Sequence, residues 1–208
     1  MLKDKTVSDF CSELASASAV PGGGGAAALA ASLGVGLDIM VGCLTVGKKK
    51  YAASEPELKE LAEKARTLLE RCIALIDADA AAFEPLSRAY ALPKDAPDRD
   101  EITEKCLDDA AAVPLELVRL CGTAIELTGR FAELGSALAV SDAGCAAALC
   151  RSSLESAALN VFVNTRLMKN RDRADELNGE VSRCLEKYIP LAENIYNSVK
   201  GKLKPDEL

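Results

Sequence analysis

Asp79 is the residue of this sequence whose type and position best suit acid/base chemistry. Between Ser54 and Leu92 the apolar residues recur with helical spacing, and at about 100° per residue they fall on one stripe. Asp79 lies inside the stripe, whereas Asp77 lies roughly 160° away and is expected at the rim or surface. The apolar members of the stripe are Leu61, Ala65, Leu68, Cys72, Ile76, Phe83 and Leu86.

A carboxylate on the core face of a helix must be paired, hydrogen-bonded or raised in pKa, because burying it bare costs several kcal/mol. A raised pKa would let Asp79 exchange protons near neutral pH, which makes it a candidate general acid/base. A structural aspartate bonded to a neighbouring helix explains the pattern equally well. The sequence contains no histidine, so Ser-His and Cys-His mechanisms are excluded.

The run Pro21-Gly22-Gly23-Gly24-Gly25 leads directly into an Ala/Gly-rich segment with helical character. Free N–H groups at a helix N-terminus favour an anionic ligand, and glycine lets that ligand approach the backbone. No Gly-Lys-Ser/Thr follows and no strand precedes, so the run is neither a P-loop nor a dinucleotide fingerprint. A flexible connection is an equally good interpretation.

Two further groups could contact a ligand. Lys48-Lys49-Lys50-Tyr51 closes the Ala/Gly-rich segment, where cations suit the negative end of the helix dipole or could bind an acidic ligand tail. Asn160 and Asn164 share one helix face and could bind a heterocycle, although amide bonds between helices are the commoner role.

These residues are expected on a bundle of helices that forms one domain over residues 1–208. Alanine and leucine, both strong helix formers, fill the sequence, while strand-favouring residues are sparse. The segment 26–47 is expected to be a buried central helix. We reject a membrane span because Asp38 lies near its middle. Helices are expected over residues 6–17, 26–47, 54–92, 100–134 (kinked at Pro114), 142–168 and 174–200.

Composition narrows the class of protein. A net charge of −7 disfavours binding to a nucleic-acid backbone. The eight cysteines include no Cys-x-x-Cys pair and the N-terminus lacks the apolar core of a signal peptide, which predicts reduced thiols and a cytoplasmic location. A chain of 208 residues can bury an adequate core, so it needs no metal or disulfide to fold.

Six segments in order resemble the cyclodeaminase/cyclohydrolase family of folate enzymes, and the similarity extends over nearly the whole chain. The resemblance implies an orthogonal, all-helical subunit that forms a homodimer, and an Ala/Gly-rich surface suits such close packing. The matching segments are PGGGG at 21–25, GKKKY at 47–51, LIDADAAAF at 75–83, VPLELV at 113–118, SDAG at 141–144 and NVFVN at 160–164.

The resemblance also implies a function and a site. Asp79, the second aspartate of the Asp-x-Asp pair, corresponds to the family's acid/base residue. A folate, possibly polyglutamylated, would be the substrate, without a metal or redox cofactor. The residues expected to bind it are Pro21, Gly22, Gly23, Gly24, Gly25, Lys49, Lys50, Tyr51, Asp142, Asn160 and Asn164.

The choice of reaction stays open between two chemistries. The family usually has Ser at the position of Gly25 and Asn at the position of Ser136, so substrate binding or reaction choice could differ here. The chain has no attached formiminotransferase segment, which favours hydrolysis of 5,10-methenyltetrahydrofolate over cyclodeamination of 5-formiminotetrahydrofolate. A non-catalytic helical scaffold is a third hypothesis, but it leaves Asp79 and the glycine run unexplained.

Overall fold

Residues 1–204 of the protein form six α-helices and three single turns of 3-10 helix. The computed structural model describes residues 1–204, and within that range it contains no β-strand. The all-α fold expected from the abundance of helix formers is confirmed. The elements are η1 (Leu2–Asp4), α1 (Val7–Leu14), α2 (Gly23–Cys43), η2 (Lys49–Tyr51), α3 (Glu55–Tyr90), α4 (Arg99–Leu134), η3 (Ala137–Ala139), α5 (Val140–Thr165) and α6 (Arg171–Leu203).

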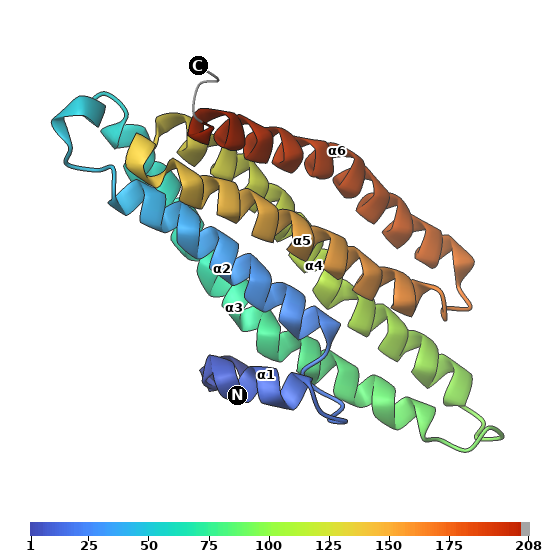
Figure 1. Cartoon of the computed structure of the whole chain (residues 1–208). Helices are drawn as coiled ribbons and strands as arrows, with labels where there is room; N and C mark the ends of the chain where they lie inside the picture. The colour runs from blue at the N-terminus through green and yellow to red at the C-terminus, as the bar shows by residue number, and fades with distance from the viewer. Residues whose placement is uncertain (205–208) are drawn as a thin grey trace.

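The long helices α2 to α6 lie side by side in one bundle, while the short α1 lies outside it, below the middle of α3 in this view (Figure 1). The helix α2 packs against α3, α4 and α5. Its small residues allow this close approach: a Cβ at Gly34 would lie 2.6 Å from Cys150 Sγ, and one at Gly42 would lie 3.0 Å from the ring of Phe131. The Ala/Gly-rich segment is therefore a helix of the core, as predicted.

One face of α2 is nevertheless not covered by the chain itself. By length and composition α2 could cross a membrane, since its most apolar window has a mean hydropathy of 1.8, yet 56% of that window is buried inside the bundle. A helix in the core of a bundle can have the same length and the same apolar composition. The uncovered remainder includes Leu33, which is 54% exposed, and Met40, which is 38% exposed. The predicted buried central helix is thus found in the bundle, with one face left exposed in the single chain.

The predicted helix ends agree with the structure to within about one helical turn, with two local corrections. Thr6 caps α1 as expected, accepting a hydrogen bond from the N–H of Asp9 at 3.1 Å. Ser54 precedes α3 but makes no side-chain cap, because its backbone is already helical rather than extended. Gly23 to Gly25 form the first turn of α2 instead of a preceding turn, and Gly22 is the N-cap.

Two aspartates outside the predicted site have structural surroundings that helical periodicity did not indicate. Asp38 on α2 is completely buried and accepts a hydrogen bond of 2.7 Å from the hydroxyl of Thr128; burial raises its pKa to about 8. Asp77 is half-buried and accepts a 2.6 Å hydrogen bond from the N–H of Leu2. Asp77 therefore lies at the rim, within the predicted range of rim or surface, and η1 folds over that side of α3.

Candidate active site

The carboxylate of Asp79 lies against the first turn of α2. The N–H of Gly25 donates a hydrogen bond of 3.0 Å to Asp79 Oδ2. Burial raises the pKa of Asp79 above its ordinary value, and the hydrogen bond from Gly25 offsets part of that rise by favouring the ionised form. The α3 stripe thus places Asp79 at an interhelical contact where it can hold or release a proton.

The glycines of α2 make room for polar side chains from two other helices. A Cβ at Gly24 would lie 2.0 Å from Asp79 Oδ1, far inside any real contact. A Cβ at Gly23 would lie 3.2 Å from Nδ2 of Asn160 on α5. At Gly25 a Cβ would meet only ordinary contacts of 3.6 Å or more, so the serine expected from the family pattern would fit at this position.

A cavity of about 340 Å³ opens between the start of α2, the second half of α3 and the end of α5. This volume lies within the range that binds small molecules. Among the residues that the structure describes, Asp79 is the only one with a carboxyl group on the cavity wall, and no Lys or Arg lines it. The lining residues are Ala19, Val20, Gly22, Gly23, Gly24, Asp79, Phe83, Leu86, Tyr90, Asn160, Val163, Asn164 and Leu167.

Backbone and amide groups supply the remaining polarity of the cavity wall. The N–H groups of Gly23 and Gly24 lie in the first turn of α2, where an α-helix provides no internal acceptor. The Nδ2 atoms of Asn160 and Asn164 donate to the carbonyls of Ser156 and Asn160, each at 2.8 Å. The side-chain oxygens of both asparagines can therefore accept hydrogen bonds from a ligand.

The apolar wall of this cavity was not among the residues predicted to form a site. Phe83, Leu86 and Tyr90 follow Asp79 on α3 at spacings of four, seven and eleven residues, so they share its helix face. Phe83 and Tyr90 are 37% and 43% exposed, unlike true core residues. The stripe had assigned Phe83 to the core. The helical spacing that identified Asp79 could have identified Tyr90 as well.

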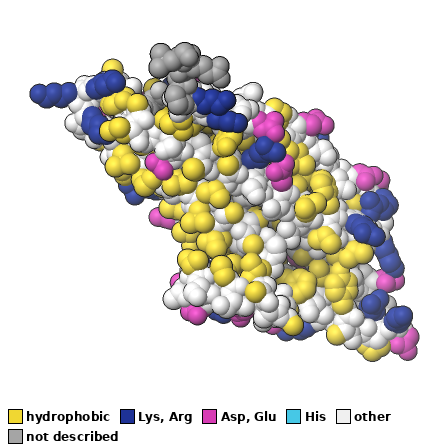
Figure 2. Space-filling model, viewed as in Figure 1, with side chains coloured by type: hydrophobic (Ala, Val, Ile, Leu, Met, Phe, Trp, Pro, Cys, Tyr) yellow, Lys and Arg dark blue, Asp and Glu magenta, His cyan; other side chains and the backbone are white. Residues whose placement is uncertain are grey.

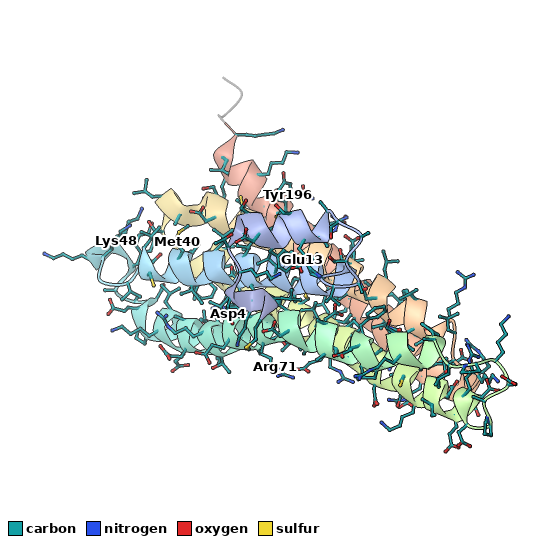
Figure 3. All side chains as sticks on the ribbon, turned by 90° about the horizontal axis from the view of Figure 1, so that it is seen from below. Asp4, Glu13, Met40, Lys48, Arg71 and Tyr196 are labelled. Carbon is teal, nitrogen blue, oxygen red and sulfur yellow. The ribbon has the colours of Figure 1, made fainter. Side chains whose placement is uncertain are left out.

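The structure separates the expected binding residues into two groups at opposite ends of α2. The glycines, Asp79, Asn160 and Asn164 meet at its N-terminal end, whereas Lys49, Lys50 and Tyr51 follow its C-terminal end. Asp142 belongs to the second group, in the first turn of α5. At 1.5 Å per residue, the 21 residues of α2 hold the groups about 30 Å apart. Figure 3 shows Lys48 at one extremity of the molecule.

The lysine end has its own hydrogen-bond network. Lys48 Nζ donates to Ser136 Oγ at 3.2 Å, and the N–H of Ala137 donates to the hydroxyl of Tyr51 at 3.0 Å. The hydrogen bond that Tyr51 accepts from Ala137 lowers the pKa of Tyr51, and the Ser136 side chain and the charges of Lys50 and Lys48 lower it further. Ser136, one of the two departures from the family pattern, therefore lies beside the lysines and not in the cavity.

The fold and this cavity define an all-helical enzyme domain with a carboxylate as its candidate proton-transfer group. The family model of formiminotransferase-cyclodeaminase matches residues 6–183, and the chain belongs to that family. This agrees with the resemblance seen in the sequence motifs.

Relatives of known name cover the chain almost completely. It is 38% identical to methenyltetrahydrofolate cyclohydrolase of Methylorubrum extorquens, over 98% of this chain and 100% of that protein. It is 29% identical to formimidoyltransferase-cyclodeaminase of Rattus norvegicus, of which the match spans 38%. The crystal structure of formiminotetrahydrofolate cyclodeaminase from Thermotoga maritima has a TM-score of 0.83 and 25% identity, with 98% of each chain covered.

Proposed function

We propose that this protein hydrolyses 5,10-methenyltetrahydrofolate to 10-formyltetrahydrofolate. The observation that carries the proposal is the Asp79 carboxylate, raised in pKa at the wall of a cavity of suitable size. The relative that is matched over its full length, at 38% identity, is a methenyltetrahydrofolate cyclohydrolase, which favours this reaction over others in the family.

The hydrolysis requires one group that first accepts and then donates a proton. Water adds to the cationic methenyl carbon while the Asp79 carboxylate takes one of its protons. The tetrahedral adduct then breaks its bond to N5, and the Asp79 carboxyl returns the proton to that nitrogen. Loss of the hydroxyl proton to solvent leaves the formyl group on N10. A carboxyl whose pKa is raised serves both steps near neutral pH.

The wall of the cavity suits the rest of this chemistry. The N–H groups of Gly23 and Gly24 can donate hydrogen bonds to the oxygen that enters from water and so position it. The asparagine oxygens can accept hydrogen bonds from the substrate's ring N–H groups, while Phe83 and Tyr90 provide aromatic surface for its rings. We propose that no metal or redox cofactor takes part, since proton transfer and water suffice for the reaction.

The second candidate function is cyclodeamination, a lyase reaction on 5-formiminotetrahydrofolate. In this reaction N10 attacks the formimino carbon, and Asp79 would protonate the departing ammonia. The solved structure matched over nearly the whole chain is a formiminotetrahydrofolate cyclodeaminase, which supports this alternative. The two reactions share the same tetrahedral carbon and the same acid/base group.

One spectrophotometric experiment decides between them. Purified protein is given methenyltetrahydrofolate, whose loss is followed by absorbance, and in a parallel cuvette 5-formiminotetrahydrofolate, whose conversion raises the same absorbance. We expect faster enzyme-dependent turnover of the first substrate. Preference for the second would assign cyclodeamination, and turnover of neither would reject both proposals.

Three further properties belong to this proposal. A polyglutamyl tail on the folate would interact with the exposed cations Lys49 and Lys50. The protein would act as a homodimer, because an exposed apolar strip on α2 needs a cover. It would work in the cytoplasm, where its eight free cysteines stay reduced. Light scattering, binding of folates with different tail lengths and cell fractionation test these points separately.

A further inference from the structure

The two carboxylate oxygens of Asp79 have different surroundings. Oδ2 accepts the 3.0 Å hydrogen bond from the N–H of Gly25. Oδ1 accepts no hydrogen bond from any residue that the structure describes, and it lies over Gly24, where a Cβ would be only 2.0 Å away. Gly24 lines the cavity and Gly25 does not. Oδ1 is therefore the oxygen that can exchange a proton with a ligand, while Oδ2 is anchored to the protein.

No steric reason requires glycine at position 25. A Cβ there would lie 3.6 Å from Cβ of Pro21, 3.8 Å from the carbonyl oxygen of Ile76 and 3.9 Å from Asp79 Oδ2, all ordinary contacts. Gly25 also has helical geometry in the first turn of α2, where alanine is intrinsically favoured over glycine. The close packing that explains Gly24 therefore leaves Gly25 unexplained, and its contact with Asp79 is the remaining feature of its surroundings.

A small polar side chain at position 25 would act on the carboxylate of Asp79 and not on the ligand. A hydroxyl oxygen one bond beyond the Cβ can come within hydrogen-bond distance of Asp79 Oδ2. Such a donor bonds the ionised carboxylate more strongly than the neutral acid, so it favours the ionised form. Gly25 supplies no such second donor, and Oδ2 keeps the backbone N–H as its single hydrogen-bond partner among the described residues.

No charged side chain of the cavity wall competes with this contact. The segment before α2, α2 itself and α5 contribute only uncharged groups, and Tyr90 on α3 is the other titratable group that lines the cavity within the described part of the chain. Asp77 bonds the N–H of Leu2 on another side of α3. Figure 2 shows hydrophobic side chains across the middle of this view of the molecule, with most charged groups toward its outline. Burial raises the pKa of Asp79 and the Gly25 N–H offsets part of the rise, so the donors at Oδ2 control how strongly Asp79 holds a proton.

The two candidate reactions need different properties of Asp79. Hydrolysis begins with the removal of a proton from water, which is a weak acid, so this step is faster with a stronger base. Cyclodeamination uses the same group as an acid that protonates the departing ammonia, and this step is faster when the carboxyl holds its proton less strongly. A second donor at Oδ2 would therefore slow hydrolysis more than cyclodeamination.

We propose that Gly25 is a specificity-determining residue: it gives Asp79 a backbone N–H but no side-chain donor, which keeps this carboxylate a base strong enough to take a proton from water and favours hydrolysis over cyclodeamination. The proposal deepens the function proposed above and rests on it. The proton passes from water to Asp79 Oδ1 as the water oxygen bonds to the methenyl carbon, and it returns to N5 when the bond from carbon to N5 breaks. Gly25 thus acts on the base, whereas the sequence had suggested a contact with the ligand.

A comparison of Gly25→Ser with Gly25→Ala separates the effect of the hydroxyl from that of the Cβ. In the pH profile of kcat/KM for methenyltetrahydrofolate, the acidic midpoint should lie about one pH unit lower for Gly25→Ser, because the hydroxyl favours the ionised form. Its kcat for hydrolysis should be about threefold lower, and its ratio of cyclodeamination to hydrolysis should be higher. KM should be the same in both variants, since position 25 does not line the cavity. Equal midpoints, or an equal ratio of the two activities, would overturn the proposal.

An NMR titration tests the contact independently of activity. The carboxyl carbon resonance of Asp79, assigned by its loss in Asp79→Asn, reports the protonation midpoint in the free protein. A lower midpoint in Gly25→Ser than in Gly25→Ala supports the contact, and equal midpoints reject it. Gly201→Ser on α6 is the control, since a Cβ there meets no atom within 4 Å, and it should keep the wild-type midpoint; a shift as large as that of Gly25→Ser would also reject the contact. If the midpoints differ but neither folate reacts, the contact holds and the proposed function fails, together with the preference for hydrolysis.

Discussion

Replacing Gly24 by alanine should remove most of the activity without unfolding the protein. The added Cβ would lie 2.0 Å from Asp79 Oδ1, and real Cβ atoms essentially never come closer than 3.0 Å. The carboxylate must therefore move by about 1 Å or rotate away from the cavity. A displacement of 1 Å at a reacting group can cost about 10²-fold in rate, so we expect kcat to fall by about this factor.

The stability of the same variant should change little. Gly24 has helical geometry in the first turn of α2, where alanine is intrinsically favoured over glycine by about 0.5–1 kcal/mol. This gain offsets part of the cost of moving the Asp79 side chain, whose carboxylate is only partly buried. Thermal unfolding should show a Tm within a few degrees of the wild type, whereas methenyltetrahydrofolate turnover should drop sharply.

Gly25→Ala is the matched control one residue further along. Its Cβ would make contacts of 3.6 Å or more with Pro21, Ile76 and Asp79, and the N–H that bonds Asp79 is kept. We expect near wild-type kcat. The reasoning is refuted if Gly24→Ala keeps full activity, or if Gly25→Ala loses as much as Gly24→Ala does.

Three other predictions follow from the charged groups. Asp79→Asn should lower kcat by on the order of 10²–10⁴ and remove the acidic limb of the pH–rate profile. In the wild type the midpoint of that limb should lie above the ordinary aspartate pKa, because burial raises the pKa of Asp79. Asp77→Asn should chiefly lower the Tm, and equal kinetic losses in the two variants would contradict the catalytic role of Asp79. Burial raises the pKa of Asp38 from its ordinary value of 3.8 to about 8 in the folded protein. Between about pH 4 and 8 this carboxyl is therefore ionised in the unfolded chain but protonated in the folded one, so the stability of the fold decreases as pH rises through that range. Calorimetry should show Asp38→Asn gaining Tm over the wild type across that range, and a constant difference would count against it. Neutralising Lys49 and Lys50 should weaken binding of polyglutamylated folate more than of monoglutamate, and added salt should shrink that difference; an equal loss for both ligands would leave these lysines only a role at the helix end.

The helices and the position of Asp79 on the packed face of α3 could be predicted from the sequence because both depend on local periodicity. The α3 stripe needed only the spacing of apolar residues over one helix, and the structure places Asp79 at an interhelical contact. The same pattern placed Asp77 at the rim or surface but could not show its partner, since the N-terminal segment that bonds to it comes from 75 residues earlier in the chain. Periodicity reports the face of one helix and not what covers that face.

The reason for the glycine run could not be obtained from the sequence. Glycines before a helix suggested a ligand against the backbone, and the structure adds a second cause: Gly24 and Gly23 leave space for Asp79 from α3 and Asn160 from α5. Steric requirements of this kind arise between segments far apart in the chain. They are visible only when the helices are packed.

The sequence by itself determined the all-helical fold, the likeness to a folate-enzyme family and the residue type available for proton transfer, because composition, helical spacing and ordered motifs are local properties of the chain. Only the tertiary structure decided which of those residues meet. Because α2 is a rigid rod about 30 Å long, it keeps Lys49 and Lys50 away from the cavity that Gly24 and Asp79 share, although all of them had been assigned to one ligand.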